Sequence, residues 1–366
     1  MKHRDKINLI LMFLIPLIVY IGMFIFALPK ANLMILYFVL ISLLGLIIGL
    51  FLAVLLHEVG HGVLGHFAKY QLLSFKFLNF EIFRDEEDKL HLQINPLNGM
   101  VLGQCLMLPP KNKKHKLKRF YLYNAGGLTF SFIWSFLLIV FFALSNIYFR
   151  WLWIAMMLIN TFLIINNICY SENGVNDRCN AEIIKKNPQY VDAINYQLRV
   201  VGNIYLGKRF GAKIEAKPYY EEKLNHISVP VVEFMMYHAI DHGDFETVKS
   251  LSLLLKQNYQ RLIFPIQKVI INFDLMWVDL VVDGNRKTFE RHFKRFTDRE
   301  KLLCEKPDTD VNFYYRLYSQ IYDKNFDLSA FIEEVKEAKC FYAGERLSLL
   351  KRLDYLSQTL CKEEAK

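Results

Sequence analysis

The sequence predicts a mainly α-helical, polytopic membrane protein with a soluble helical domain at its C-terminal end. Of the 366 residues, 53% are hydrophobic, and most of the apolar residues gather in the first half of the chain. From about Glu182 onward the chain becomes charged and amphipathic. Four runs in the first half are almost free of charge and long enough to cross a bilayer as helices, at about 1.5 Å per residue: residues 7–29, 33–56, 120–149 and 151–170.

The first apolar run predicts a retained transmembrane helix and not a cleaved signal peptide. It follows a basic start, MKHRDK, as signal peptides do. However, it exceeds the roughly 7–15 residues of a signal peptide's apolar region, and no small-x-small cleavage site stands at its end. We therefore treat residues 1–31 as an additional N-terminal transmembrane segment.

The distribution of lysine and arginine predicts the orientation in the cell membrane. The N-terminus is basic, and the link between the second and third runs contains KNKKHKLKR (residues 111–119), whereas the other two links hold only Lys30 and Arg150. Cytoplasmic loops are enriched in Lys and Arg, so the N-terminus, this link and the C-terminal domain should face the cytoplasm. The net charge of +9 then reflects attraction to anionic headgroups of the bilayer, and we expect no nucleic-acid partner.

The cysteines predict free thiols. They show no C-x-x-C spacing, and most would face the cytoplasm, where disulfides are rare. We expect neither a disulfide framework nor a cysteine-rich zinc site. The six are Cys105, Cys169, Cys179, Cys304, Cys340 and Cys361.

Residues 70–110, between the second and third apolar runs, predict a small β-sheet or hairpin insertion. The segments LSFKFLNFEIF, KLHLQI and MVLGQCLML alternate in the manner of strands, and the turn signals RDEED and NPLNG separate them.

The second apolar run ends in HEVGH, residues 57–61. In a helix His57 and His61 lie on one face and can hold one cation between them. Glu58 lies about 100° further round, where it can reach a metal-bound water as a general base. Ionisable residues at the end of a membrane span are costly unless they pair or bind something. The pattern therefore predicts a catalytic Zn²⁺ site, the alternative being a polar helix end at the membrane interface.

A catalytic zinc needs a third protein ligand, and His66 does not qualify. It follows His57 by nine residues, about half a turn away from the site on a continuous helix. It also misses the HExxHxxGxxH spacing, whose last position holds Phe67.

Asp177 is the favoured third ligand. It stands in an Asn- and Gly-rich turn just after the fourth apolar run, on the same predicted side of the membrane as HEVGH, and a carboxylate suits zinc. Glu172 in the same loop is the second candidate. The alternative for Asp177 is that it only caps a helix starting near Asn180.

HEVGHG in one apolar run and an acidic residue after a later one resemble the site-2 protease family of intramembrane zinc metalloproteases. YNAGGLTFSF (residues 123–132) has Ala125, Gly126 and Gly127 where that family has a small-residue motif. The β insertion lies where the family has a short sheet and a membrane-dipping hairpin. The resemblance covers roughly residues 33–180.

The resemblance implies a protease core over residues 32–180, with His57, His61 and Asp177 as zinc ligands and Glu58 as the base. The chain departs from the family near the third ligand. The family usually has an asparagine and a proline some eight residues before an Asp-Gly pair. Here Asn167 precedes Asp177 by ten residues, proline is missing and Arg178 follows.

The implied activity is hydrolysis of a peptide bond in or near the membrane-embedded segment of a membrane protein, a signal-peptide remnant or a peptide precursor. One alternative is a noncatalytic membrane adaptor with a degenerate protease core, against which the intact Glu58 argues. Another is the CAAX-processing type of membrane HExxH protease. Its third ligand is a glutamate within a later helix, whereas the candidate here follows a turn.

Three further features bear on substrate binding. An edge strand from residues 95–109 could hold an extended substrate by strand addition. Asn160 and Asn167 lie seven residues apart on one helix face and either bind substrate backbone or join helices. The small-residue stripe of Gly45, Gly49 and Ala53 favours helix packing over substrate contact.

Residues 181–366 predict a cytoplasmic α-helical repeat domain. Gly202, Gly243, Gly284 and Asn325 mark turns at an interval of 41 residues, which favours stacked helical hairpins in a solenoid. GDFETVKSLSLLLKQ resembles half of a tetratricopeptide repeat. Such a domain presents a face for a protein or peptide partner. We expect no second metal site from its scattered histidines, His226, His238, His242 and His292.

Overall fold

A computed structural model of the chain describes most of the residues after position 31. The predicted first span at residues 7–29 and the candidate ligand Glu172 lie outside the described residues. The described ranges are 32–85, 87–94, 102–111, 114–169, 176–214, 216–261, 265–305, 309–337 and 341–364.

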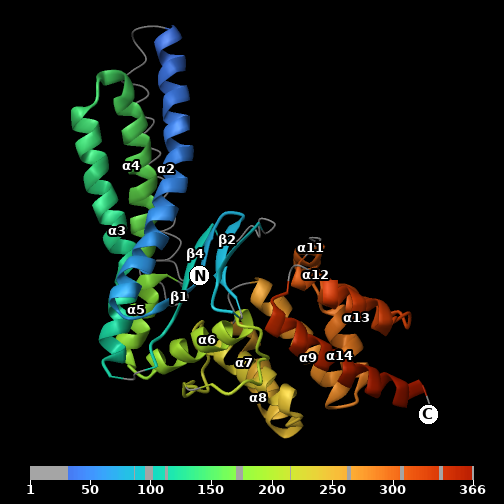
Figure 1. Ribbon diagram of the computed structural model, residues 1–366. Helices are drawn as coiled ribbons and strands as arrows, with labels where there is room; N and C mark the ends of the chain where they lie inside the picture. Colours follow the sequence, from blue (N-terminus) through green and yellow to red (C-terminus); the bar gives the residue numbers. More distant parts are fainter. Residues whose placement is uncertain are drawn as a thin grey trace. The chain divides into compact units, whose positions relative to one another are not determined.

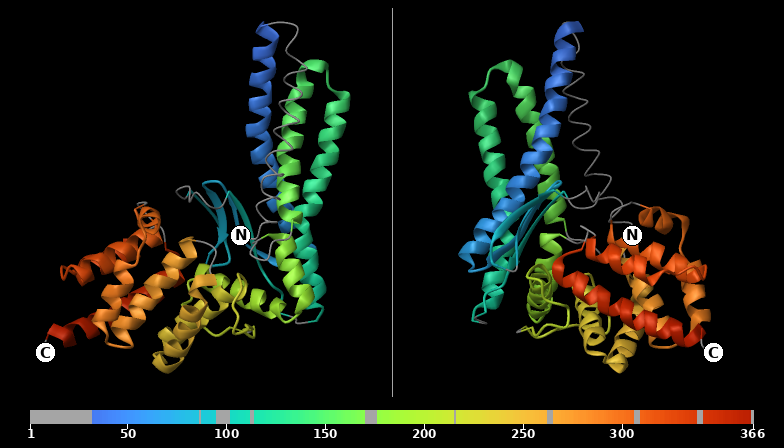
Figure 2. Two further views of the ribbon diagram at one scale, coloured as in Figure 1. Left: turned by 180° about the vertical axis from the view of Figure 1, so that it is seen from behind. Right: turned by 45° about the vertical axis from the view of Figure 1, so that its right-hand side comes forward.

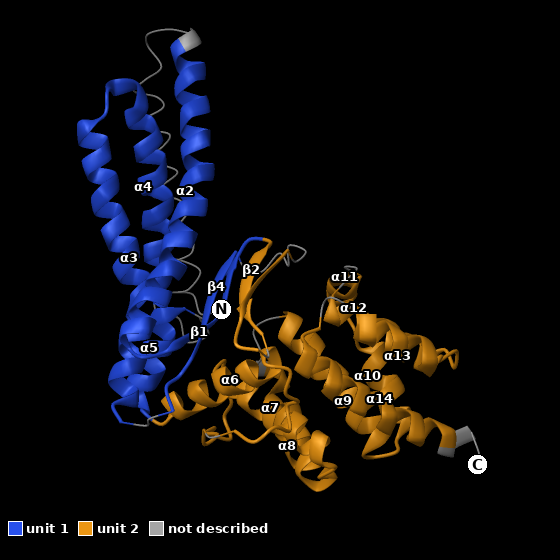
Figure 3. Ribbon diagram, viewed as in Figure 1, with its two compact units in different colours: residues 1–78, 99–188 blue, residues 79–98, 189–366 orange. Residues whose placement is uncertain are grey.

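The chain divides into two compact units (Figure 3). Unit 1 comprises Met1–Leu78 and Gly99–Pro188, and unit 2 comprises Asn79–Asn98 and Gln189–Lys366. The sequence had placed the whole β insertion in the membrane core and had ended that core at residue 180. In the structure the middle of the insertion groups with the C-terminal helices, and the division falls after Pro188.

Unit 1 is built on three long apolar helices that lie side by side (Figures 1 and 2). They are α2 (Asn32–Phe67), α3 (Lys116–Leu144) and α4 (Ile147–Ile168), and each is long and apolar enough to cross a membrane. The sequence placed the break between the last two near residue 150. It falls at Asn146 instead, because this side chain accepts hydrogen bonds from the first N–H groups of α4.

Glycines set the close approach of these helices. A Cβ atom on Gly60 of α2 would lie 2.3 Å from the carbonyl oxygen of Gly126 in α3, and the reverse substitution would meet Gly60 at the same distance. Gly45 and Gly49 lie close against α4, where added Cβ atoms would come within 2.6 Å and 2.9 Å of its backbone. The small-residue stripe therefore packs helices, as expected.

Among its described residues, unit 1 also contains two strands and one short helix. Strands β1 (Gln71–Phe77) and β4 (Gly103–Leu108) pair antiparallel, with Phe75 opposite Cys105. Helix α5 (Asp177–Lys186) follows α4.

Unit 2 begins with the antiparallel hairpin of β2 (Phe80–Arg84) and β3 (Leu90–Ile94). Its helical part has an apolar core around the buried side chains of Phe273, Trp277 and Tyr318. The helices are α6 (Tyr190–Tyr205), α7 (Ser228–His242), α8 (Phe245–Asn258), α9 (Pro265–Val281), α10 (Arg286–Lys294), α11 (Asp298–Cys304), α12 (Asp310–Tyr322), α13 (Leu328–Glu337) and α14 (Ala343–Glu364), with a short 3₁₀ turn at Tyr259–Arg261.

The expected turns of the 41-residue interval are present at three positions out of four. Gly243 ends α7 with φ at +72°, Gly284 follows α9 with φ at +58°, and Asn325 lies between α12 and α13. The prediction of a turn at Gly202 is wrong: this residue is buried inside α6, because apolar side chains continue to face the core as far as Tyr205.

Helices α7 and α8, α9 and α10, and α13 and α14 pack as neighbouring pairs. The last helix, α14, also packs on α6, α7 and α9. In an open solenoid each repeat contacts only its neighbours. The packing of the last helix, α14, on the much earlier helices α6, α7 and α9 therefore differs from an open solenoid.

The β2–β3 hairpin is fixed to the helices of unit 2 by one buried carboxylate. Glu81 is only 1% exposed, and its oxygens accept hydrogen bonds from the hydroxyl of Tyr205 at 2.7 Å and that of Tyr342 at 2.9 Å. Gln93 of β3 donates to the same carboxylate at 3.0 Å. These contacts explain why the hairpin belongs to unit 2.

Replacing Gly60 by Ala should destabilise the protein by roughly 1–3 kcal/mol, because the new methyl group would overlap the backbone of α3. Gly62→Ala is the matched control, since its Cβ would lie 3.5 Å from the nearest atom, Cys105 Sγ. Both substitutions add the same helix propensity. Thermal unfolding of the purified full chain in detergent measures the difference; equal stability of the two variants would contradict the close crossing.

Glu81→Ala should lower the free energy of unfolding by roughly 1–3 kcal/mol, because the hydroxyls of Tyr205 and Tyr342 lose this buried carboxylate as an acceptor. Glu87→Ala provides the control, since the Glu87 side chain is 70% exposed. Denaturant unfolding of the full chain, followed by tyrosine fluorescence, compares the two. An unchanged midpoint for Glu81→Ala would show that the hairpin does not depend on this carboxylate.

Candidate metal centre

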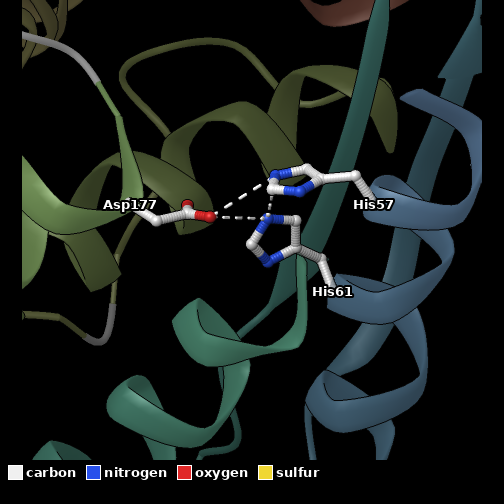
Figure 4. A group of neighbouring side chains, drawn as sticks. All are labelled: His57, His61 and Asp177. Atoms are coloured by element: carbon white, nitrogen blue, oxygen red, sulfur yellow. Dashed lines mark hydrogen bonds and ion pairs between the residues drawn. The ribbon is translucent and has the colours of Figure 1, made fainter. Parts of the chain in front are cut away.

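Three of the sequence-predicted site residues come together in unit 1 (Figure 4). His57 and His61 point from α2 toward Asp177, the first residue of α5. Asp177 Oδ2 lies 3.4 Å from the Nε2 atom of each histidine, and the two Nε2 atoms are 3.3 Å apart. The two histidines are buried. No other group of His, Cys, Asp and Glu side chains in the described ranges has metal-binding spacing.

Local sequence explains how each ligand candidate is placed. The helix α2 continues through HEVGH to Phe67, so His57 and His61 lie one turn apart on the face toward α3. Asp177 does not serve as the helix cap that the sequence left open. Asn176 takes that role, since its side chain accepts a hydrogen bond from Cys179 N–H at 2.8 Å. The Asp177 carboxylate is therefore free to face the histidines.

The imidazole rings are oriented by partners on α3. His61 Nδ1 lies 3.0 Å from the carbonyl oxygen of Tyr123. A carbonyl only accepts, so His61 carries its proton on Nδ1, and in the neutral ring Nε2 keeps a lone pair. His57 Nδ1 lies 3.2 Å from the hydroxyl oxygen of Ser131. This is the arrangement in which histidines bind a metal through Nε2.

The triangle of donor atoms fits a zinc ion. Zinc bound tetrahedrally at about 2.0–2.1 Å requires donor atoms about 3.3–3.4 Å apart, which matches the three distances among His57, His61 and Asp177. At 3.4 Å the contacts to Asp177 are long for hydrogen bonds, and its buried Oδ2 has no hydrogen-bond partner among the described residues. One proton cannot form a hydrogen bond from each of the two imidazole nitrogens to the carboxylate. One metal cation, in contrast, would accept a lone pair from all three atoms.

Gly127 provides the room that these side chains need. A Cβ atom at this position would lie 2.4 Å from His57 Cε1 and 2.6 Å from His61 Nε2. A side chain there would therefore fill the space into which both imidazoles point.

Asp177 is held both by its backbone and by its charge. The side-chain amide of Asn124 donates to the Asp177 carbonyl oxygen at 2.9 Å, which ties the start of α5 to α3. Burial opposes ionisation of the carboxyl, but the neighbouring His57 and His61 outweigh it and lower the pKa of Asp177 to about 2. The carboxylate is therefore ionised at neutral pH.

Glu58 lies beside this group without belonging to it. Its carboxylate accepts a hydrogen bond from the backbone of Cys105 in β4, and a Cβ atom on Gly103 would approach its Cγ to 2.8 Å. Burial, with a smaller contribution from Glu58, raises the pKa of the Cys105 thiol to about 12. Within the described ranges this thiol is not part of the group with metal-binding spacing.

The remaining sequence candidates lie elsewhere. His66 is exposed and outside the group, as its helical position predicted. Asn160 joins helices: its amide donates to Ser131 O at 2.9 Å and to Ser135 Oγ at 2.7 Å. The amide of Asn167 donates within its own helix, to Leu163 O. The described cysteines are free thiols, as expected.

Of the supporting residues on α3, the sequence singled out only Gly127, as part of the small-residue motif, and not its role beside the histidines. Tyr123, Gly127 and Ser131 contact or make room for the histidines, and Asn124 holds Asp177. The signal was present, since positions 123, 127 and 131 repeat at i, i+4 and i+8 and so lie on one helix face. The role of this face could not be predicted, because the sequence does not show which helix it packs against.

Neither a protein-family model, nor a characterised protein, nor a solved structure matches this chain.

Purified full-length protein should contain about one zinc per chain, because the donor set matches that ion. His57→Ala and His61→Ala should remove it, and Asp177→Ala should weaken affinity by more than about 100-fold, since even outer-shell partners cost about 10–100-fold. His66→Ala, the control, should retain full occupancy. Elemental analysis by mass spectrometry measures the metal. If Asp177→Ala keeps zinc while Glu172→Ala loses it, the third ligand is misassigned.

Proposed function

We propose that the chain is an intramembrane zinc metalloendopeptidase of the site-2 protease type. It would hydrolyse a peptide bond in or near the membrane-embedded segment of a membrane protein, a signal-peptide remnant or a peptide precursor. The observation that carries the proposal is that Asp177 meets His57 and His61 at zinc-ligand spacing, and that the two histidines lie on a helix apolar enough to span a membrane.

The residues around this group suit metal-assisted hydrolysis. Zinc, when bound, polarises a carbonyl and lowers the pKa of a water toward 7. His57, His61 and Asp177 would hold the ion, and the Tyr123 carbonyl, which only accepts, keeps a proton on His61 Nδ1 and so leaves Nε2 for the ion. Glu58 follows His57 directly and is free to take a proton from the attacking water and to pass it to the leaving amine.

The setting in the bilayer supports a membrane substrate. Candidate ligands on α2 lie toward the C-terminal end of a 34-residue apolar segment, near a membrane boundary where water and an unwound substrate can meet. A substrate helix must unwind before cleavage, because its backbone groups are otherwise satisfied within the helix. The α3–α4 pair provides the two further helices of a three-helix core.

The wider topology is part of the same proposal. With a first span at residues 7–29, the chain crosses the cell membrane four times, and its lysine and arginine distribution orients both the N-terminus and unit 2 toward the cytoplasm. The C-terminal helices then act as a repeat-like platform for a protein or peptide partner. In this role they would bring substrates to the cytoplasmic end of the core.

The two alternatives are less consistent with the site. A noncatalytic adaptor has no need of Glu58, nor of three donor atoms at metal-ligand distance. A CAAX-type protease would take its third ligand as a glutamate within a later helix. Here the acidic partner is an aspartate at the first position of α5.

Glu58→Gln should abolish proteolysis while leaving zinc bound, because the amide cannot act as a base but has the same shape. The rate should fall by roughly 10²–10⁴-fold. Fluorescein-labelled casein in detergent, an unfolded chain with no helix to unwind, serves as the test substrate. Glu182→Gln, on α5 and paired with Arg178 at 2.6 Å, is the matched control.

In cells, the Glu58→Gln variant should accumulate an uncleaved membrane protein or peptide, which quantitative membrane proteomics would identify. Full cleavage by Glu58→Gln, in either assay, would contradict the protease mechanism. Zinc binding without any cleavage by the wild-type protein would favour the adaptor.

A further inference from the structure

Tyr123 contacts the metal-ligand group and strand β4 at the same time. Its backbone carbonyl accepts from His61 Nδ1 at 3.0 Å, and its ring lies 5.5 Å from that imidazole. Its hydroxyl donates a 2.7 Å hydrogen bond to the carbonyl oxygen of Cys105 in β4. One residue of α3 therefore touches both a ligand candidate and the strand beside Glu58.

The register of the β1–β4 pair explains why Cys105 is available for this contact. Leu78 N–H donates to Leu102 O at 2.9 Å, and the next pairs along the strands alternate between bonded and non-bonded. Cys105, opposite Phe75, falls at a non-bonded pair. Its N–H and carbonyl therefore point away from β1.

Both of these outward groups are used within unit 1. The Cys105 carbonyl accepts from Tyr123, and the Cys105 backbone donates to the Glu58 carboxylate. The Tyr123 hydroxyl is thus connected to Glu58 through a single residue of β4. A substrate strand added to β4 could therefore not pair with Cys105, because the N–H and carbonyl groups of this residue already have partners.

The fit around Glu58 leaves little freedom for β4 to shift. A Cβ atom on Gly103 would lie 2.8 Å from Glu58 Cγ and 2.7 Å from Val54 Cγ1. Because the strand backbone lies directly against this side chain, movement of β4 would change where the carboxylate sits.

We propose that Tyr123 is a positioning residue for Glu58: its hydroxyl fixes β4 at Cys105, and the Cys105 backbone in turn fixes the Glu58 carboxylate relative to His57 and His61. This inference rests on the proposed hydrolase function. It assigns Tyr123 no direct contact with substrate and no role as a metal ligand.

Tyr123→Phe isolates the hydroxyl. The variant keeps the backbone carbonyl that holds His61, and it keeps the ring that stacks on Tyr70 at 5.1 Å. Zinc content should therefore stay at the wild-type level. The cobalt-substituted protein should show an unchanged d–d absorption spectrum, because the ligands themselves do not move.

The kinetic effect should appear in kcat alone. With fluorescein-labelled casein, kcat should fall roughly tenfold or more, because small misplacements of a reacting group are costly, and KM should not change. Tyr121→Phe, two positions earlier in α3 and so on another face of the helix, removes the same hydroxyl group and should retain full kcat.

A second readout does not depend on activity. Cys105 is only 4% exposed, so its thiol should react slowly with N-ethylmaleimide while β4 is fixed. Labelling in Tyr123→Phe should be several-fold faster, because strand opening exposes the thiol. Mass spectrometry of the Cys105 peptide measures the rate separately from those of the other cysteines.

The outcomes separate the two proposals. If the wild-type protein cleaves casein and Tyr123→Phe cleaves it equally well, or if the variant loses zinc, the positioning role is overturned. Unchanged Cys105 labelling also overturns it. If the wild-type protein cleaves neither casein nor any membrane substrate, the proposed function itself fails, and the positioning role fails with it.

Discussion

Two imidazole nitrogens and one carboxylate oxygen converge within 3.4 Å of one another, and the rest of unit 1 depends on this contact. Their lone pairs repel unless a cation lies between them, and burial makes that repulsion stronger. Holding the group together without a cation would require protonated rings. The contact of His61 Nδ1 with the Tyr123 carbonyl turns Nε2 toward the other two donor atoms, where it would bind a metal.

Helix α3 is the element that makes this convergence possible. Its face of Tyr123, Gly127 and Ser131 orients both imidazoles and leaves space between them. The Gly60–Gly126 crossing brings α3 close enough to α2 for these contacts. Small residues at such crossings are typical of membrane helices, where close packing takes the place of the hydrophobic effect. The geometry of the candidate metal site and the packing of the helices therefore depend on the same few positions.

The sequence predicted which side chains come together in unit 1 better than it predicted the division of the chain into units. Helical spacing predicted that His57 and His61 share one face with Glu58 close by. The distribution of lysine and arginine placed Asp177 on the same side of the membrane as these residues. Local patterns could not show which surfaces meet. The role of Asn124 and the grouping of the β2–β3 hairpin with unit 2 through Glu81 both rest on contacts between distant segments. The predicted turn at Gly202 was wrong because a glycine within a strongly apolar helix face does not end the helix.

The central claim is that His57, His61 and Asp177 bind one zinc ion directly. X-ray absorption at the zinc edge of the purified full-length protein tests it most directly. The account predicts a first shell of nitrogen and oxygen at about 2.0–2.1 Å, with the outer scattering of two imidazole rings. Sulfur scatterers near 2.3 Å, or a spectrum with no imidazole contribution, would contradict it.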